Sequence, residues 1–195
     1  WELFFSGAES RVVAEDQALR QAICYAIDEE GLITGLCAGY GTRMWDVCPP
    51  DRIGFLDKWK DEAYYEYDPD KAKELLEASG YNGETLTLLC SSTTFVSRCA
   101  QMIQNYLAAV GIKMEINSVD SALLTAIRLD GTQYDMFINT IGGTYLPDHW
   151  TIRYDPAAYE TGDATSRHDY DLAELMYETW TTDGFTDENI DKVHN

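Results

Sequence analysis

The sequence predicts an α/β domain in which helices flank a mostly parallel central sheet built from βαβ units. Strand-like stretches occur at 85–90, 112–116 and 134–141, and helical periodicity fills the two intervals between them. This alternation is typical of parallel sheets, because two parallel strands need a long crossover connection. The third stretch is apolar at consecutive positions, as expected for a strand that is buried on both faces.

The length and composition are those of one globular domain. The chain has 195 residues, of which 45% are hydrophobic and 25% are charged. A chain of this length can bury a sizeable core and is short for two domains, so we expect a single α/β lobe over residues 1–195. Its apolar runs are only a few residues long, so we expect no transmembrane helix.

The N-terminal part predicts a strand followed by two helices. Residues 1–5 form an apolar, strand-like stretch that starts abruptly and without methionine, so we expect the chain to be a piece of a longer protein. Asp16 is the expected N-cap of a helix over 17–27, and Asp28 is the expected N-cap of a shorter helix that ends near Leu36.

Residues 37–67 interrupt this regular pattern. Glycines and prolines punctuate the segment, and its aromatic residues include Trp45, Phe55, Trp59, Tyr64, Tyr65 and Tyr67. A span of this length without regular structure is often functional in a compact domain. The alternative is a loop whose aromatic side chains pack into the core.

Regular structure returns at Asp68 and Pro69, which predict the N-cap and the first position of a helix over 70–79 that ends at Gly80. Further helices are expected over 96–110 before Gly111, over 121–129 after the cap residue Asp120, shortly after Pro147, over 169–180, and at the C-terminus.

The charge balance excludes several classes of partner. Fourteen Lys and Arg residues against 34 Asp and Glu residues give a net charge of −20. This charge repels phosphate backbones and anionic lipids, so we expect neither nucleic acid nor a membrane surface as a partner. The three histidines lie far apart, and phosphate-binding and nucleophile-elbow motifs are missing from the sequence. We therefore expect no metal, no cofactor and no enzymatic activity.

The five cysteines do not have the spacing of a zinc or CxxC redox site. Cys24 and Cys99 fall within predicted helices, where we expect them to act as small apolar residues. Cys37 and Cys48 flank a loop, and the sequence leaves open whether they form a disulfide in an oxidising compartment.

The candidate ligand site lies at the ends of two predicted strands. Open parallel sheets bind ligands beyond the carboxyl ends of their strands. The residues at these ends are small and rich in hydroxyl groups, and two aromatic residues follow them: Ser91, Ser92, Thr93, Thr140, Gly142, Gly143, Tyr145 and Trp150. Two alternatives remain open, namely that Thr93 or Thr94 caps the following helix and that Trp150 packs in the core.

Four stretches resemble the solute-binding proteins of ABC importers for peptides, nickel and oligosaccharides. Residues 19–28 (LRQAICYAID) are similar to the family helix RQAI-YAID, and residues 67–81 (YDPDKAKELLEASGY) to its YDPEKAKELLAEAGY stretch. Residues 101–113 resemble AEMIQ…LAKVGIK, and Pro147–Trp150 stand where the family has DPDNF. In this order, the motifs are specific to that family.

The resemblance implies a fold like that of type II periplasmic binding proteins, of which this chain is the C-terminal, ligand-binding lobe. The N-terminal lobe and a C-terminal return segment would then lie outside this sequence, together with half of the ligand cleft. The resemblance further implies an extracellular or periplasmic location, permease subunits in the membrane as partners, and a lipid anchor at the N-terminus of the full-length protein.

The charged ligand anchors of dipeptide-binding relatives have no counterpart at the matching positions. Their aspartate after a GW-GD strand end is replaced here by the sequence Thr-Ile-Gly-Gly at 140–143. Their arginine before the long helix is replaced by Ser91–Phe95, which leaves only Arg98, expected on the helix. The resemblance therefore implies a longer peptide held through its backbone, or an oligosaccharide stacked on aromatic residues, rather than a free dipeptide.

The sequence thus predicts a lobe that binds a solute, in the first place an oligopeptide, for uptake by an ABC transporter, with closure of two lobes around the ligand. Three alternatives stay open: an oligosaccharide-binding member of the same family, a ligand-sensing ectodomain that signals rather than transports, and a carbohydrate-active enzyme with paired carboxylates.

Overall fold

The computed structural model describes residues 1–44, 55–61, 65–139, 175 and 186–194. The helices and strands are β1 (Glu2–Phe5), α1 (Val12–Glu15), α2 (Gln17–Ala26), α3 (Glu29–Cys37), η1 (Asp57–Asp61), α4 (Pro69–Ala78), β2 (Leu86–Ser91), α5 (Thr94–Val110), β3 (Met114–Val119), α6 (Ser121–Arg128), η2 (Gly131–Gln133), β4 (Met136–Asn139) and α10 (Asp187–His194). The helices expected after Pro147 and over 169–180 lie outside the described residues, apart from residue 175.

The chain divides into two compact units. The first unit comprises Trp1–Arg43 and Tyr64–Ile141, and the second comprises Met44–Ala63 and Gly142–Asn195. A single lobe over residues 1–195 therefore stays a prediction.

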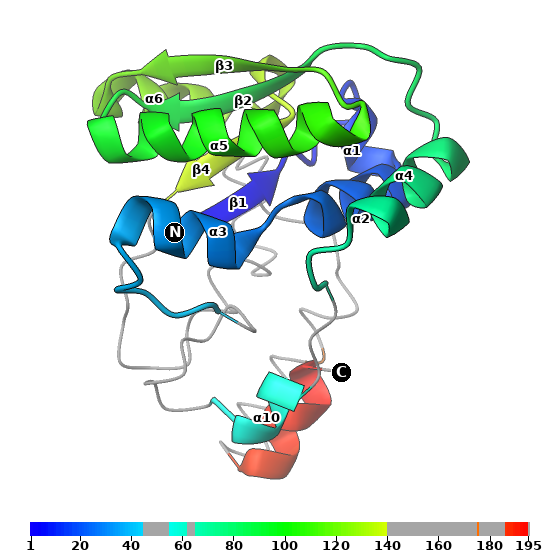
Figure 1. Ribbon diagram of the computed structural model, residues 1–195, viewed down its shortest axis with the longest axis vertical. Helices are drawn as coiled ribbons and strands as arrows, with labels where there is room; N and C mark the ends of the chain where they lie inside the picture. Colours follow the sequence, from blue (N-terminus) through cyan, green and yellow to red (C-terminus); the bar gives the residue numbers. More distant parts are fainter. Residues whose placement is uncertain (45–54, 62–64, 140–174, 176–185, 195) are drawn as a thin grey trace. The chain divides into compact units, whose positions relative to one another are not determined.

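A four-stranded sheet with the order β1-β4-β2-β3 forms the centre of the first unit. Strand β2 pairs in parallel with both β3 and β4, so the predicted mostly parallel sheet is confirmed. Strand β1 is the exception, because it pairs antiparallel with β4, from Glu2 opposite Asn139 to Phe5 opposite Met136. Figure 1 shows this reversal, with the arrowhead of β1 pointing away from the side to which the other three point.

Strand β3 begins two residues later than the sequence predicts. Ile112 is buried as expected, but its amide donates a hydrogen bond of 2.9 Å to the carbonyl of Leu107 at the end of α5. Gly111 permits this closure because its φ of 97° lies in the left-handed region. Ile112 therefore belongs to the cap of α5, and the ladder with β2 starts at Met114.

Alternating residues of the strands face two separate cores. Leu86, Leu88 and Cys90 of β2 lie in the larger core, with Ala100, Ile103 and Leu107 of α5 and Leu19 and Ile23 of α2. Leu89 of β2 lies in the smaller core, with Tyr134, Phe137 and the partly buried Leu124 and Ile127 of α6. The sheet is thus covered on both faces, with α5 in front of it in Figure 1.

Asp16 joins the two helices that the family-like motifs predicted. Its Oδ1 accepts a hydrogen bond from the Leu19 amide at 2.9 Å and caps α2, as expected. Its Oδ2 accepts from the Gly80 amide at 2.6 Å, just beyond α4. At the other end of the pair, the Asp68 amide donates to the Tyr25 carbonyl at 2.9 Å. Hydrogen bonds therefore join α2 and α4 to each other near both ends of the pair.

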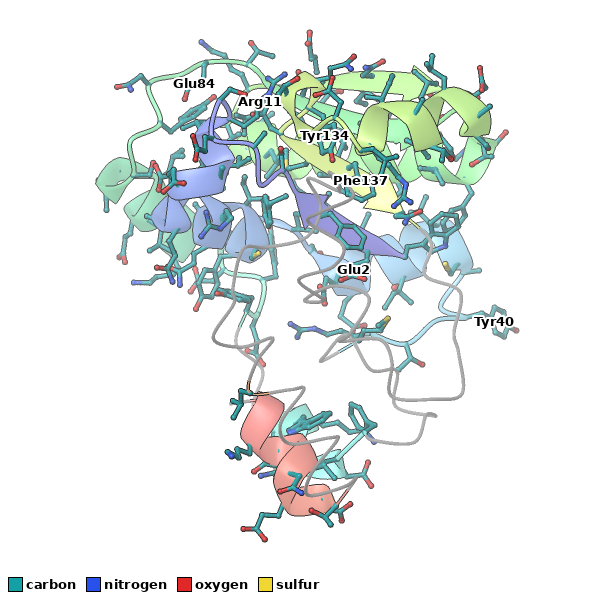
Figure 2. The ribbon with its side chains drawn as sticks, turned by 180° about the vertical axis from the view of Figure 1, so that it is seen from behind. Glu2, Arg11, Tyr40, Glu84, Tyr134 and Phe137 are labelled. Carbon is teal, nitrogen blue, oxygen red and sulfur yellow. The ribbon has the colours of Figure 1, made fainter. Side chains whose placement is uncertain are left out.

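Asp135 connects three strands at the edge where β2 and β4 begin. Its Oδ2 accepts a hydrogen bond of 2.7 Å from the Thr87 amide and lies 3.6 Å from an Arg11 guanidinium nitrogen. Its backbone carbonyl accepts from the Ser6 amide at 2.8 Å. Burial is the largest influence on this carboxyl and raises its pKa above the ordinary value. Figure 2 shows Arg11 and Tyr134 at this end of the sheet.

In the second unit, Trp59 joins η1 to the C-terminal helix α10. Its side chain is buried, and its Nε1 donates a hydrogen bond of 3.2 Å to Asp191. Lys58 forms an ion pair of 2.5 Å with the same carboxylate. For Trp59 the core-packing interpretation of the aromatic segment is correct. Trp45 and Tyr64 lie outside the described residues.

Replacing Asp16 tests the link between α2 and α4. We expect Asp16→Ala to lower the free energy of unfolding by about 1–2 kcal/mol, because it removes a helix cap and leaves the Gly80 amide without its acceptor. Urea denaturation gives this value. The exposed neighbour Glu15 provides the control, and an Asp16→Ala cost no larger than that of Glu15→Ala would contradict the assignment.

The raised pKa of Asp135 predicts a pH dependence of stability. The folded carboxyl binds its proton more readily than the unfolded one, so its contribution to stability is full below the ordinary pKa of 3.8 and is lost as pH rises through the folded pKa. Asp135→Asn keeps a hydrogen-bond acceptor for Thr87 and cannot titrate. In urea denaturation at several pH values, wild type should lose stability relative to Asp135→Asn as pH rises. Parallel curves would show that Asp135 does not have a raised pKa.

Candidate functional site

Four strands contribute to one edge of the sheet in the first unit. Strand β2 ends there at Ser91, opposite Val119 of β3, and β4 ends there at Asn139. Because β1 is antiparallel to β4, β1 starts at this edge, with Glu2 opposite Asn139. We call these four residues and those that directly adjoin them the strand-end edge, which lies on the side of the arrowheads of β2, β3 and β4 in Figure 1.

The structure brings the predicted residues Ser91, Ser92 and Thr93 together at this edge. The hydroxyl oxygens of Ser91 and Thr93 lie 3.1 Å apart and share a hydrogen bond. The Ser92 amide donates to the Val119 carbonyl at 2.7 Å, which fixes this turn against the end of β3. Ser92 and Thr93 are exposed and Ser91 is half-buried, so this turn presents small hydroxyl groups to solvent.

Thr93 occupies the N-cap position of α5 without acting as a side-chain cap. Its backbone is extended, and its side chain makes no capping hydrogen bond. Its hydroxyl group instead pairs with Ser91. The capping alternative for Thr93 is therefore correct for the backbone position and wrong for the side chain, because the nearby Ser91 hydroxyl provides a competing partner.

Trp1 and Phe95 form an aromatic pair at the same edge, which the sequence analysis missed. Their ring centroids lie 5.1 Å apart, with an angle of 27° between the ring planes. Trp1 directly precedes β1, and Phe95 lies in the first turn of α5, two residues after Thr93. The sequence indicates a strand at 1–5 but not its direction, and only the antiparallel direction places Trp1 here.

The charged residues Asp120 and Arg98 are near this turn in the sequence or the sheet, but one caps α6 and the other lies on α5. Asp120 directly follows β3, and its Oδ1 accepts hydrogen bonds from the Ala122 and Leu123 amides at 2.9 and 3.0 Å, which caps α6. Arg98 is exposed on α5, as the sequence predicts. The stretch from Ser91 to Phe95 itself contains no charged side chain. These residues can offer hydrogen bonds and apolar surface rather than ion pairs.

The remaining predicted site residues lie outside the described residues: Thr140, Gly142, Gly143, Tyr145 and Trp150. They follow Asn139, the half-buried last residue of β4. Their place at the site stays a prediction.

Cys90 and Cys99 of the first unit have free thiols. Burial raises the pKa of Cys90, and it raises the pKa of Cys99 to about 11, so both stay protonated at neutral pH and are poor nucleophiles. Cys99 is buried in the larger core, as expected, whereas Cys24 is half-buried. Cys37 also carries a free thiol, and its candidate partner Cys48 lies outside the described residues.

In the described part of the chain, no three His, Cys, Asp or Glu side chains converge as they would around a metal ion. None of its helices combines the length and the apolar character needed to cross a membrane.

The cap geometry predicts different costs for two neighbouring substitutions. Thr93→Ala should change the free energy of unfolding by less than about 0.5 kcal/mol, because its hydroxyl makes no capping bond. Asp120→Ala should cost about 1 kcal/mol, because it removes the cap of α6. Urea denaturation of both variants checks this difference. Equal costs would show that the Thr93 side chain stabilises α5 after all.

Comparisons with known proteins all lead to one class. The family model for bacterial extracellular solute-binding proteins, family 5 Middle, matches residues 4–162. Glutathione-binding protein GsiB of Escherichia coli K12 is 36% identical over 109 residues, which are 55% of this chain and 20% of GsiB. The match thus spans about a fifth of the length of this curated relative.

Solved structures share the fold over nearly the whole chain. AgaA from A. tumefaciens R10, in complex with agropinic acid, superposes with a TM-score of 0.81 at 26% identity, over 98% of this chain and 39% of AgaA. AppA of Clostridium difficile gives a TM-score of 0.83 at 19% identity, over 98% of this chain and 39% of AppA. DppA of Helicobacter pylori, in complex with the peptide STSA, gives 0.79 at 24% identity, over 98% and 37%.

Proposed function

Because the chain belongs to family 5 of the bacterial extracellular solute-binding proteins, we propose that it is the part of an ABC importer's binding protein that holds an oligopeptide. The match of the family model over residues 4–162 carries this proposal. The predicted resemblance to this family and the predicted fold class, that of type II periplasmic binding proteins, are confirmed.

The strand-end edge supports the proposal with suitable chemistry. Ser91, Ser92 and Thr93 present hydroxyl and backbone groups at the ends of parallel strands, where α/β sheets bind ligands. Such groups match the amide and carbonyl groups of a peptide backbone, which are neutral. Thr140, Gly142, Gly143, Tyr145 and Trp150 belong to the same proposed site.

The lack of charge between Ser91 and Phe95 favours a longer peptide over a free dipeptide. A free dipeptide carries two terminal charges close together, and each needs a partner when it is buried. A longer peptide carries more neutral backbone per terminal charge. Two relatives support a peptide ligand, since DppA was solved with the peptide STSA and GsiB binds glutathione.

A second candidate ligand class follows from AgaA. That protein, 26% identical to this chain, was solved with agropinic acid. The aromatic pair of Trp1 and Phe95 is compatible with a small polar ring compound as well as with a peptide. An opine-like or oligosaccharide-like solute is therefore the alternative to an oligopeptide.

We further propose that the full-length protein acts without catalysis, delivers its ligand to permease subunits, and is held at the membrane by an N-terminal lipid. Family membership supports solute binding outside the cytoplasm, since the family comprises extracellular solute-binding proteins. Binding and delivery require closure of the site around the ligand and no covalent step.

A thermal-shift screen of the full-length protein tests the proposed function. The panel contains dipeptides, tripeptides, longer peptides, oligosaccharides and opines. A true ligand at a hundredfold excess over its Kd should add about 2.7 kcal/mol to the free energy of unfolding. We expect this shift with longer peptides. A shift with oligosaccharides or opines alone would transfer the assignment to the second class, and a folded protein without any shift would contradict solute binding.

A further inference from the structure

Near the strand-end edge, one face of the sheet changes from apolar to polar side chains. Phe137 of β4 lies in the smaller core, with Leu89 opposite it on β2 and Phe4 opposite it on β1. Side chains two residues apart on a strand point to the same face of a sheet. The next side chains on this face, one step closer to the edge, are all polar. They are Glu2, Asn139 and Ser91, which we call the polar row.

Strand pairing aligns the members of the polar row. Glu2 lies directly opposite Asn139 in the ladder between β1 and β4 (Figure 2 labels Glu2 and Phe137). On the other side of β4, the parallel register that pairs Leu89 with Phe137 places Ser91 beside Asn139 when it continues for two residues. Asn139 is therefore the central member of the row, on an inner strand of the sheet.

Asn139 differs from its neighbours because its hydrogen-bonding groups are unused. The Ser91 hydroxyl shares a hydrogen bond with Thr93, and Glu2 has an interaction of its own. Among the described residues, no group hydrogen-bonds to the Asn139 carboxamide, although Asn139 is half-buried and ends a strand whose other three residues are buried. Polar groups in such surroundings normally have a partner. The donor and the acceptor of this side chain are therefore available to a ligand.

The chemistry of a carboxamide defines what can bind to it. It offers an N–H donor and a C=O acceptor side by side and carries no charge. The backbone of an extended peptide presents the matching pair, because the N–H and the C=O of one residue point to the same side. Two neighbouring hydroxyls of a sugar offer the same pattern of one donor and one acceptor, so the experiment has to separate these two sources.

We propose that Asn139 is a ligand-binding residue that hydrogen-bonds to the backbone N–H and C=O of one residue of the bound peptide. This inference rests on the proposed function, which supplies the peptide, and it adds a residue to the predicted site. The side-chain oxygen of Asn139 accepts from the peptide N–H, and its side-chain nitrogen donates to the peptide carbonyl.

The experiment changes both partners of the proposed hydrogen bonds. The probes are tetra-alanine, its three single-ester analogues, in each of which an oxygen replaces one backbone N–H, and maltotetraose. Each probe is titrated by calorimetry into full-length wild type, Asn139→Ala, Asn139→Asp and Asn117→Ala. Asn117 is the matched control, since it is a half-buried asparagine of β3 opposite Leu89, on the same face of the sheet but before the strand-end edge.

We expect wild type to bind at least one ester analogue about 2- to 13-fold more weakly than tetra-alanine, the value of one neutral hydrogen bond expressed as affinity. For one such analogue, Asn139→Ala should remove this difference, and it should bind tetra-alanine at least about twofold more weakly than wild type. Asn139→Asp has the same shape and keeps an acceptor but no donor, so it should bind tetra-alanine more weakly and still discriminate against that analogue. Asn117→Ala should match wild type with every probe.

The other outcomes contradict defined parts of the proposal. If Asn139→Ala discriminates among all the analogues as wild type does, another group binds the peptide N–H, and the inference fails while peptide binding stands. Equal losses in Asn139→Ala and Asn117→Ala would show a general effect of this face of the sheet rather than a contact. Maltotetraose binding that depends on Asn139, in a protein that binds no peptide, would assign the carboxamide to sugar hydroxyls. A folded wild type that binds no solute of the thermal-shift panel would contradict the proposed function as well.

Discussion

The antiparallel ladder between β1 and β4 is the interaction on which the rest of the first unit depends. It joins the first residues of the chain to residues more than 130 positions later and completes the sheet on the far side of β4. The same ladder sets both edges. It places Glu2 and Trp1 beside the end of β4, and it brings the Ser6 amide to the Asp135 carbonyl at the other edge. A shift of one residue would exchange the buried faces of β1, and Phe4 would then leave its stack on Phe137.

The two edges of the sheet have different chemistry. Asp135 and Ser6 are buried, and the polar groups around them pair with one another through Thr87 and Arg11, so this edge is part of the framework. At the strand-end edge Ser92 and Thr93 are exposed. The edge around Asp135, whose polar groups bond to one another, therefore supports the strand-end edge, whose polar groups face solvent. This arrangement suits a lobe that must bind a ligand without refolding.

Local features of the fold were predictable residue by residue. Asp16, Asp28, Asp68 and Asp120 all cap the helices for which the sequence predicted them, because a cap bond spans only two or three residues. Gly111 ends α5 for a similarly local reason. The prediction was less accurate where a local group had a competing partner. Ile112 joined the cap of α5 rather than the strand, and the Thr93 hydroxyl bonded to Ser91 rather than to the helix.

The sequence by itself determined the class of the fold, the starts of the helices that aspartates cap, the hydroxyl-rich turn at Ser91–Thr93 and the family to which the chain belongs. Periodicity, caps and motifs are local, so they can be read along the chain. Only the tertiary structure decided the direction of β1 and the meeting of Trp1 with Phe95, because a strand pattern has no direction until another strand pairs with it. Likewise, the sequence shows that Asp16 can cap α2, but only packing brings Gly80 to its second oxygen.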